Sequence, residues 1–246
     1  MNNPKITCIA VNWWAKDFAE LMVDSIIKKI KTDDFEIIIV DNSGELDWGK
    51  DFNSDERIIF YHRINNLVNN LGHGAGLDLA VKRAKGEYIL VLDIDSHILL
   101  QDWDEKLIKH FEDNKLDYMG GEGGLLKPVR PCVVFFKRQW FIDGKYSFKD
   151  ERAKLANGNE LKFDVGVSMY HQAIHKGFKT KLFPYRKTEF ENVFGNEYGL
   201  GGERFVYHNW YSCRWFDKSG KMVHSKIDGN NYFEWLEKKN NLFKQI

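Results

Sequence analysis

The sequence predicts an α/β fold with a mostly parallel central sheet flanked by helices. Four short runs rich in β-branched and aromatic residues recur in the first hundred residues, at 5–11, 35–41, 57–61 and 87–93. Such runs are typical of strands that are covered on both faces. Two of the segments between them, 16–31 and 74–85, carry apolar residues at helical spacing. Strands that alternate with helices indicate βαβ units and therefore parallel strand pairs.

The second half of the chain is less regular and predicts a mixed arrangement. We expect, in order, a helix over 102–115, a glycine-rich loop at 120–124, a strand at 132–136, a helix from 165 to the C-cap Gly177, strands at 178–185 and 204–208, and an amphipathic helix over 232–243. No linker or repeat separates these parts. We therefore predict a first half (1–100) and a second half (101–215) that share one sheet, followed by a helical tail (216–246).

Composition excludes several classes of protein. The 246 residues include 36 Lys+Arg and 36 Asp+Glu, a net charge of +0 that argues against a nucleic-acid partner. The three cysteines, far apart in sequence, form neither a disulfide framework nor a Cys-x-x-Cys metal site. No apolar stretch approaches the ~20 residues that span a bilayer. We expect a cytoplasmic protein with at most peripheral membrane contact, and we predict no oligomeric state.

Two aspartates end the fourth predicted strand. The segment YILVLDID at 88–95 places Asp93 and Asp95 at the carboxyl end of a buried strand, where parallel sheets bind ligands. Paired carboxylates suit Mg²⁺ or Mn²⁺, with phosphate oxygens completing the coordination. Two chemistries fit: Asp93 as the nucleophile of a haloacid-dehalogenase-type phosphatase, or the D-x-D motif of a nucleotide-sugar glycosyltransferase. His97 stands where the phosphatase motif has Thr or Val, and turn capping by the two aspartates is the structural alternative.

Three landmarks, in order, resemble the family 2 glycosyltransferases with the GT-A fold. They are IIIVDNSG at 37–44, the glycine-containing segment from 69 onward, and GEYILVLDID at 86–95. The resemblance covers roughly residues 5–215, and it departs from the family at Asp78, where Asn is usual. It implies that the first half binds a nucleoside diphosphate sugar of UDP, GDP or dTDP. It also implies that the second half binds the acceptor and supplies a catalytic base.

The same resemblance implies a role for individual residues. The metal is expected on Asp93, Asp95 and His208, and Asp41 is expected to accept a hydrogen bond from the nucleotide base. Donor-binding residues are expected at Val11, Asn12, Asp41, Gly72, His73, Asp93 and Arg214, with a surface ion pair as the alternative for Arg214. Independently of the family, the glycines at 72, 74 and 76 precede a predicted helix, whose N-terminus attracts anions. Tight packing of that helix on a strand is the alternative for these glycines, and His73 faces the ligand or fills a gap.

One acidic residue of the second half is the expected catalytic base. The segment that begins Phe163-Asp164-Val165-Gly166 resembles the family's acidic motif, which makes Asp164 the expected base and Glu160 its competitor. Helix capping by Asp164 is the structural alternative. Five basic residues without an acidic one follow between 176 and 187. We expect them to form a solvated face, with a footprint for an anionic acceptor or a lipid surface as the alternative.

Together these features predict an enzyme. The expected reaction moves a sugar from a nucleoside diphosphate sugar to an acceptor hydroxyl on a glycan, lipid or protein, with metal dependence and inversion at the anomeric carbon. A non-catalytic module that binds a nucleotide sugar or a glycan is the main alternative. Phosphatase chemistry at Asp93 is the other.

Overall fold

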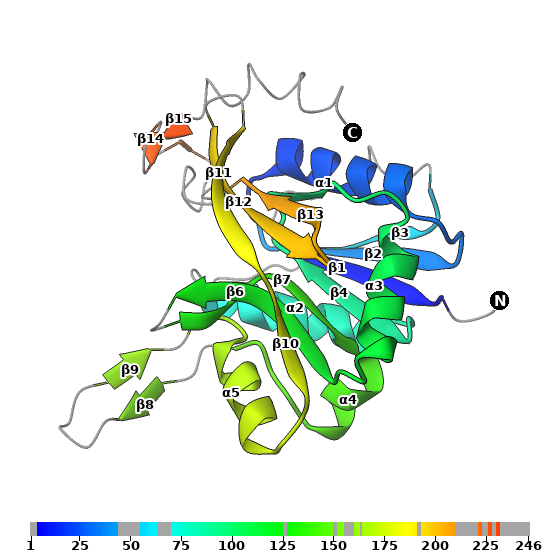
Figure 1. Cartoon of the computed structure of the whole chain (residues 1–246). Helices are drawn as coiled ribbons and strands as arrows, with labels where there is room; N and C mark the ends of the chain where they lie inside the picture. Colours follow the sequence, from blue (N-terminus) through cyan, green and yellow to red (C-terminus); the bar gives the residue numbers. More distant parts are fainter. Residues whose placement is uncertain are drawn as a thin grey trace.

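A seven-stranded sheet forms the centre of the computed structural model (Figure 1). The structure describes residues 4–43, 55–62, 70–124, 127–149, 152–154, 160–162, 164–190, 193–209, 221–222, 226–227 and 230–231. The strand order is β10-β6-β7-β4-β1-β2-β3, and only β7 runs antiparallel to its neighbours. The strands are β1 (Ile6–Asn12), β2 (Phe35–Asp41), β3 (Ile58–His62), β4 (Tyr88–Leu92), β6 (Tyr118–Gly124), β7 (Lys127–Lys137) and β10 (Thr180–Phe183).

Helices cover both faces of this sheet, so each face has its own hydrophobic core. Helices α1 (Lys16–Lys29) and α3 (Trp103–Asp113) pack on one face. The other face is covered by α2 (Asn70–Arg83), α4 (Arg138–Asp143) and α5 (Val167–His175). Successive residues of each central strand alternate between the two cores, as the pleat requires. This two-sided burial explains the continuous apolar runs from which the α/β fold was predicted, and that prediction is confirmed.

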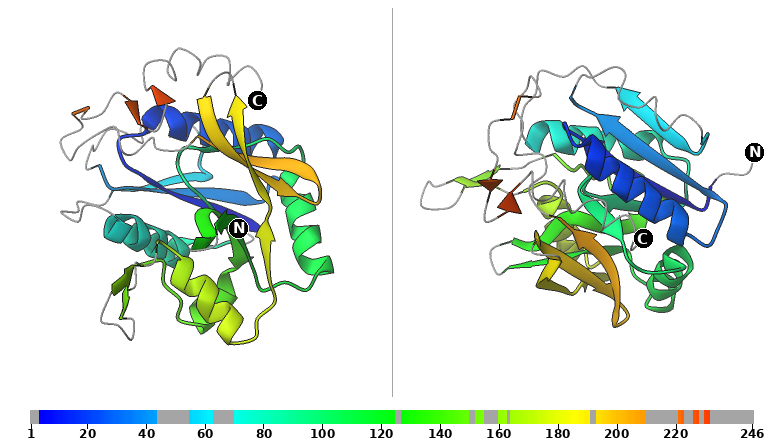
Figure 2. Two further views of the ribbon diagram at one scale, coloured as in Figure 1. Left: turned by 60° about the vertical axis from the view of Figure 1, so that its left-hand side comes forward. Right: turned by 90° about the horizontal axis from the view of Figure 1, so that it is seen from above.

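A second, antiparallel sheet carries the chain back toward the end of β4. Its order is β11-β12-β13-β5, with β5 (Ser96–Ile98), β11 (Tyr185–Phe190), β12 (Val193–Leu200) and β13 (Glu203–His208). Strands β10 and β11 follow one another around Pro184 as one long bent ribbon (Figures 1 and 2). Two short hairpins complete the described chain, β8 (Arg152–Lys154) with β9 (Glu160–Lys162) and β14 (Lys226–Ile227) with β15 (Asn230–Asn231). Because β13 ends at His208 beside β5, the second sheet brings His208 next to the D-x-D turn.

The structure overturns the prediction of a glycine-rich loop at 120–124. These residues belong to β6, which pairs with β7 and β10. A Cβ on Gly120 would overlap the Val129 side chain, and one on Gly121 would lie 2.9 Å from the Tyr198 ring. The glycines therefore serve close packing of neighbouring side chains rather than mobility. The C-terminal helix predicted over 232–243 lies outside the described residues.

Helix α2 begins earlier than predicted. It starts at Asn70, so Gly72, Gly74 and Gly76 lie inside the helix instead of preceding it. A Cβ on Gly74 would overlap the carbonyl oxygen of Phe148, and one on Gly76 would lie 2.7 Å from a methyl group of Val11. At Gly74 and Gly76 the packing alternative is therefore correct. Close contact between α2 and its neighbours outweighs the low helix propensity of glycine.

Asp78 ties the segment that follows α4 to α2. Its Oδ1 accepts the Phe148 N–H (2.8 Å), and its Oδ2 accepts the Ser147 hydroxyl (2.7 Å). Asp78→Ala should lower the free energy of unfolding by about 1–3 kcal/mol, because the buried Phe148 N–H loses its acceptor. Asp78→Asn should cost less, since its carbonyl oxygen still accepts that N–H. Urea denaturation checks the order of the two variants, and a neutral Asp78→Ala would contradict this account.

Among the described residues, no helix has both the length and the hydrophobicity needed to cross a membrane.

Candidate functional site

The D-x-D turn is held rigidly at the carboxyl end of β4. The Asp93 N–H donates to the carbonyl of Cys132 on β7 (3.1 Å), and the Ser96 N–H closes the turn on the carbonyl of Asp93 (2.9 Å). Asn209 fixes Asp95 through two hydrogen bonds to its carbonyl, one from the backbone N–H (2.9 Å) and one from Nδ2 (2.8 Å). Both aspartate side chains therefore extend from a stretch of backbone that hydrogen bonds hold to β7 and to Asn209.

The structure brings Asp93, Asp95 and His208 together, as the sequence predicted. His208 Nε2 lies 3.1 Å from Asp95 Oδ1 and 3.4 Å from Asp93 Oδ2. One ligand atom from each of the three residues lies within 4.8 Å of the others. Asp95 and His208 are buried, whereas Asp93 is partly exposed. We call these three residues the DDH cluster.

Opposite charges stabilise one another within the DDH cluster. Burial alone would raise the pKa of Asp93, but the hydrogen bond from His208 and the charges of His73 and His208 lower it below its ordinary value. Burial alone would lower the pKa of His208, but Asp95, Cys132 and Asp93 hold it well above its ordinary value. Asp93 is therefore ionised at neutral pH, and a positive charge is favoured beside it.

The donor set of the DDH cluster fits a divalent cation. Two carboxylates and an imidazole suit Mn²⁺, and the carboxylates suit Mg²⁺. Within the part of the chain that the structure describes, Asp93 Oδ1 is buried and has no hydrogen-bond partner. His73 Nε2 lies 3.6 Å from this oxygen. An ionised oxygen without a partner, at the end of a strand, is the kind of atom that a cation or its water satisfies.

His73 and Asp164 approach the DDH cluster from the other side of the central sheet. His73 stands in the first turn of α2, and Asp164 lies just before α5. The negative charge of Asp164 is close enough to raise the pKa of Asp93. Asp164 does not cap α5, because the N-cap position is Gly166, and its Oδ1 accepts the adjacent Val165 N–H (2.9 Å). The capping alternative is therefore wrong.

Asp41 ends β2, and its fully buried carboxylate is the centre of a hydrogen-bond network. Its Oδ1 accepts Asn12 Nδ2 (2.7 Å) and the Ser43 hydroxyl (2.8 Å), while His62 Nδ1 lies 3.6 Å from Oδ2. Asn12 Oδ1 accepts the Ala15 N–H (3.1 Å). The side chain of Asn12 therefore orients Asp41 and the start of α1, and the donor contact predicted for Asn12 stays a prediction.

The remaining predicted site residues lie in different parts of the chain. The Val11 side chain packs in the core beneath α2. The carbonyl of Gly72 accepts Asn42 Nδ2 (2.9 Å), which ties the start of α2 to the end of β2. Glu160 is the first residue of the short strand β9, which precedes α5 in the chain. Arg214 lies outside the described residues.

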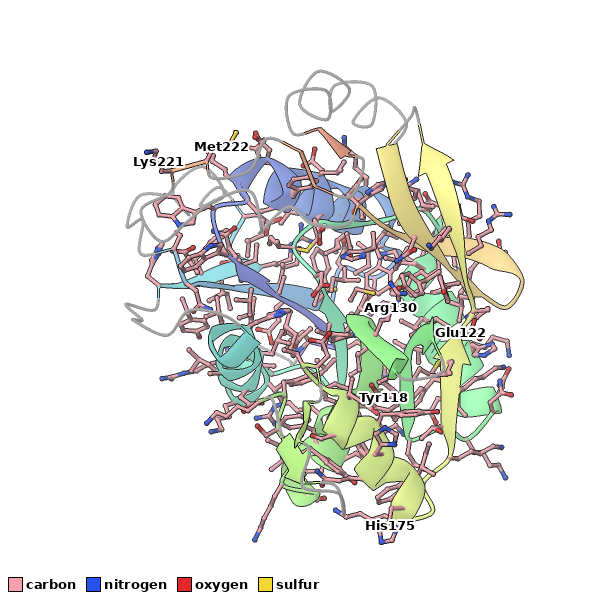
Figure 3. The ribbon with its side chains drawn as sticks, turned by 90° about the vertical axis from the view of Figure 1, so that its left-hand side faces the viewer. Tyr118, Glu122, Arg130, His175, Lys221 and Met222 are labelled. Carbon is pink, nitrogen blue, oxygen red and sulfur yellow. The ribbon has the colours of Figure 1, made fainter. Side chains whose placement is uncertain are left out.

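Sequence reasoning missed two residues at this site. Ser96 and Asn196 flank His208 across the second sheet, and no sequence signal marks them because they meet only through strand register. Figure 3 labels Glu122 on β6 and Arg130 on β7, which both contact Tyr185. The Arg130 guanidinium lies 5.0 Å from the centre of the Tyr185 ring, and Glu122 Oε2 accepts the Tyr185 N–H (3.2 Å).

Comparisons with known proteins agree with this geometry. Residues 10–125 match the family model described as glycosyl transferase family 2. An uncharacterised glycosyltransferase of Methanocaldococcus jannaschii is 29% identical over 163 residues, which cover 61% of this chain and 53% of that protein. This chain thus spans about half the length of that relative.

The fold is also found in a solved structure. A mannosyltransferase of Pyrobaculum calidifontis, solved with GDP-mannose and Mn²⁺, superposes with a TM-score of 0.54 at 16% identity. The superposition covers 75% of this chain and 56% of that one. The S. aureus protein TarS (residues 1–349), solved with UDP-GlcNAc, gives a TM-score of 0.49 at 16% identity and covers 63% of this chain and 51% of that one.

Proposed function

We propose that this chain is a family 2-like glycosyltransferase with the GT-A fold, which transfers a sugar from a nucleoside diphosphate sugar to an acceptor hydroxyl. The observation that carries the proposal is the DDH cluster at the carboxyl end of β4, with Asp164 beside it. We propose residues 1–100 as the donor half and 101–215 as the acceptor half. A binding module would not need a base next to the cluster, and the phosphatase alternative has no support from the fold.

The donor would lie across the carboxyl ends of β1, β2 and β4. Asp41, oriented by Asn12, would accept a hydrogen bond from the nucleotide base. Gly72 and His73, in the first turn of α2, would face the diphosphate, because the N-terminus of a helix attracts anions. Mn²⁺ or Mg²⁺ held by Asp93, Asp95 and His208 would neutralise the charge that develops on the diphosphate leaving group.

Asp164 is the proposed base. Its carboxylate would take the proton of the acceptor hydroxyl as the acceptor oxygen bonds to the anomeric carbon and the bond from that carbon to the diphosphate breaks. One displacement without a protein nucleophile inverts the anomeric carbon. A base in position contributes roughly 10² to 10⁴ in rate. Glu160 remains the competing candidate.

The acceptor would enter from the side of β6, β7 and the second sheet. Glu122 and Arg130 lie on β6 and β7, and we propose that they line the path of the acceptor, whose hydroxyl belongs to a glycan, lipid or protein. We place the reaction in the cytoplasm. Cys8 and Cys132 are free and buried, as expected of a protein in a reducing compartment.

A thermal-shift panel tests the proposal. UDP-, GDP-, dTDP- and CMP-sugars are added with and without Mn²⁺, and one nucleotide class should raise the melting temperature only when the metal is present. At 100 times the dissociation constant a ligand adds about 2.7 kcal/mol to the free energy of unfolding, which is several degrees for a protein of this size. EDTA should reverse the shift. The absence of a shift with every donor would contradict the proposal.

A further inference from the structure

Three buried polar residues form one row across the second sheet. On β12, Asn196 is the direct partner of His208, and on β5, Ser96 is the partner of His208 from the other side. The next row on the same face contains Tyr198, Val206 and Ile98, which all belong to the hydrophobic core. Because residues two apart in a strand share a face, the polar row also points into the molecule. Asn196 and Ser96 are completely buried.

The polar atoms of this row lack partners. Among the described residues, none forms a hydrogen bond with Ser96 Oγ, with either amide atom of Asn196 or with His208 Nδ1. A buried polar group without a partner costs about 1–3 kcal/mol, so such groups are rare and call for an explanation. Here a complete amide without partners lies directly opposite an imidazole nitrogen without a partner.

The chemistry of His208 supplies the explanation. Its Nε2 is the atom that faces Asp93 and Asp95. A metal ligand nitrogen must be unprotonated, so the neutral ring must carry its proton on Nδ1 and donate it to an acceptor. That acceptor fixes the tautomer and the orientation of the ring.

We propose that Asn196 is this acceptor and therefore a positioning residue for the metal site. Its Oδ1 takes the Nδ1–H of His208 and holds Nε2 toward the two carboxylates. Directly opposed residues of an antiparallel pair have Cβ atoms about 4.5–5.5 Å apart, a gap that the carboxamide of asparagine bridges more readily than the shorter serine hydroxyl. The proposal rests on the proposed metal dependence, because Asn196 acts through His208.

A calorimetric titration of the protein with Mn²⁺ alone tests the proposal. Asn196→Ala should weaken Mn²⁺ binding roughly 10- to 100-fold, the usual effect of removing the partner of a metal-bound histidine. Asn196→Asp keeps an acceptor oxygen at the same place and should restore most of the affinity. Ser96→Ala is the matched control from the other side of His208 and should bind as the wild type does. His208→Ala reports the loss of the ligand itself.

The outcomes separate this inference from the proposed function. If Asn196→Ala binds Mn²⁺ as tightly as the wild type while His208→Ala does not bind, Asn196 has no positioning role and the metal site stands. A large loss in Ser96→Ala with none in Asn196→Ala would assign the role to Ser96. If the wild type itself does not bind Mn²⁺, both the inference and the metal dependence are wrong.

A spectroscopic measurement on the wild type tests the proposal even if a variant folds poorly. Long-range ¹H–¹⁵N spectra of the Mg²⁺-loaded wild type report which ring nitrogen of His208 carries the proton. The wild type is expected to show a single tautomer of His208, protonated on Nδ1. Asn196→Ala is expected to show a mixture of the two tautomers. A purely structural role would lower the melting temperature of the variant without changing its tautomer, and a wild type protonated on Nε2 would overturn the proposal.

Discussion

Asp95→Asn is expected to reduce sugar transfer by at least about 10³-fold, a loss of about 4 kcal/mol in transition-state stabilisation. The two carboxylates of the DDH cluster share one imidazole, and Asp95 makes the shorter contact with it, 3.1 Å against 3.4 Å. Asparagine has nearly the same shape but no charge, so the variant removes an anionic ligand while the packing is kept. Mn²⁺ affinity, measured by calorimetry, should fall together with the rate.

A matched control separates this effect from a general loss of charge. Asp113 lies on the exposed side of α3, where it pairs with Lys109. Asp113→Asn should leave both transfer and Mn²⁺ binding within about twofold of the wild type, since exposed pairs contribute little. Normal transfer by a folded Asp95→Asn variant, with folding shown by its melting temperature, would remove the DDH cluster from the mechanism.

The local pattern was sufficient to predict the first half of the fold. Strand β2 occupies the predicted range 35–41, and β1, β3 and β4 begin within one residue of theirs, because runs buried on both faces have few other solutions. The D-x-D position also followed from the sequence, since it needs only the end of β4. Family resemblance, rather than pattern, supplied His208, which is 113 residues after Asp95.

What the sequence could not predict depends on contacts between distant segments. The glycines of β6 resemble a loop until Val129 and Tyr198 are placed against them, and those of α2 resemble a helix start until Phe148 and Val11 are known to be there. Likewise, Ser96 and Asn196 are ordinary polar residues of short strands. Only the register of three strands places them beside His208 and makes their lack of partners meaningful.

Asp164→Asn is expected to separate chemistry from binding. The turnover number should fall by roughly 10² to 10⁴, because the variant cannot take the proton of the acceptor hydroxyl. Donor binding should persist, since Asp164 is not a member of the DDH cluster. The thermal shift given by the preferred nucleotide sugar with Mn²⁺ is therefore expected to stay close to that of the wild type. Initial-rate kinetics with saturating donor and acceptor provide the turnover numbers.

The comparison with Glu160→Gln decides between the two candidate bases. Only Asp164 is known to be near the cluster, through the effect of its charge on the pKa of Asp93. If Asp164 is the base, Glu160→Gln should retain turnover within a few-fold. The reverse result, with turnover lost in Glu160→Gln and kept in Asp164→Asn, would move the base to β9. Donor binding with no turnover in the wild type would instead favour a non-catalytic module, since a binding protein needs the nucleotide site but not the base.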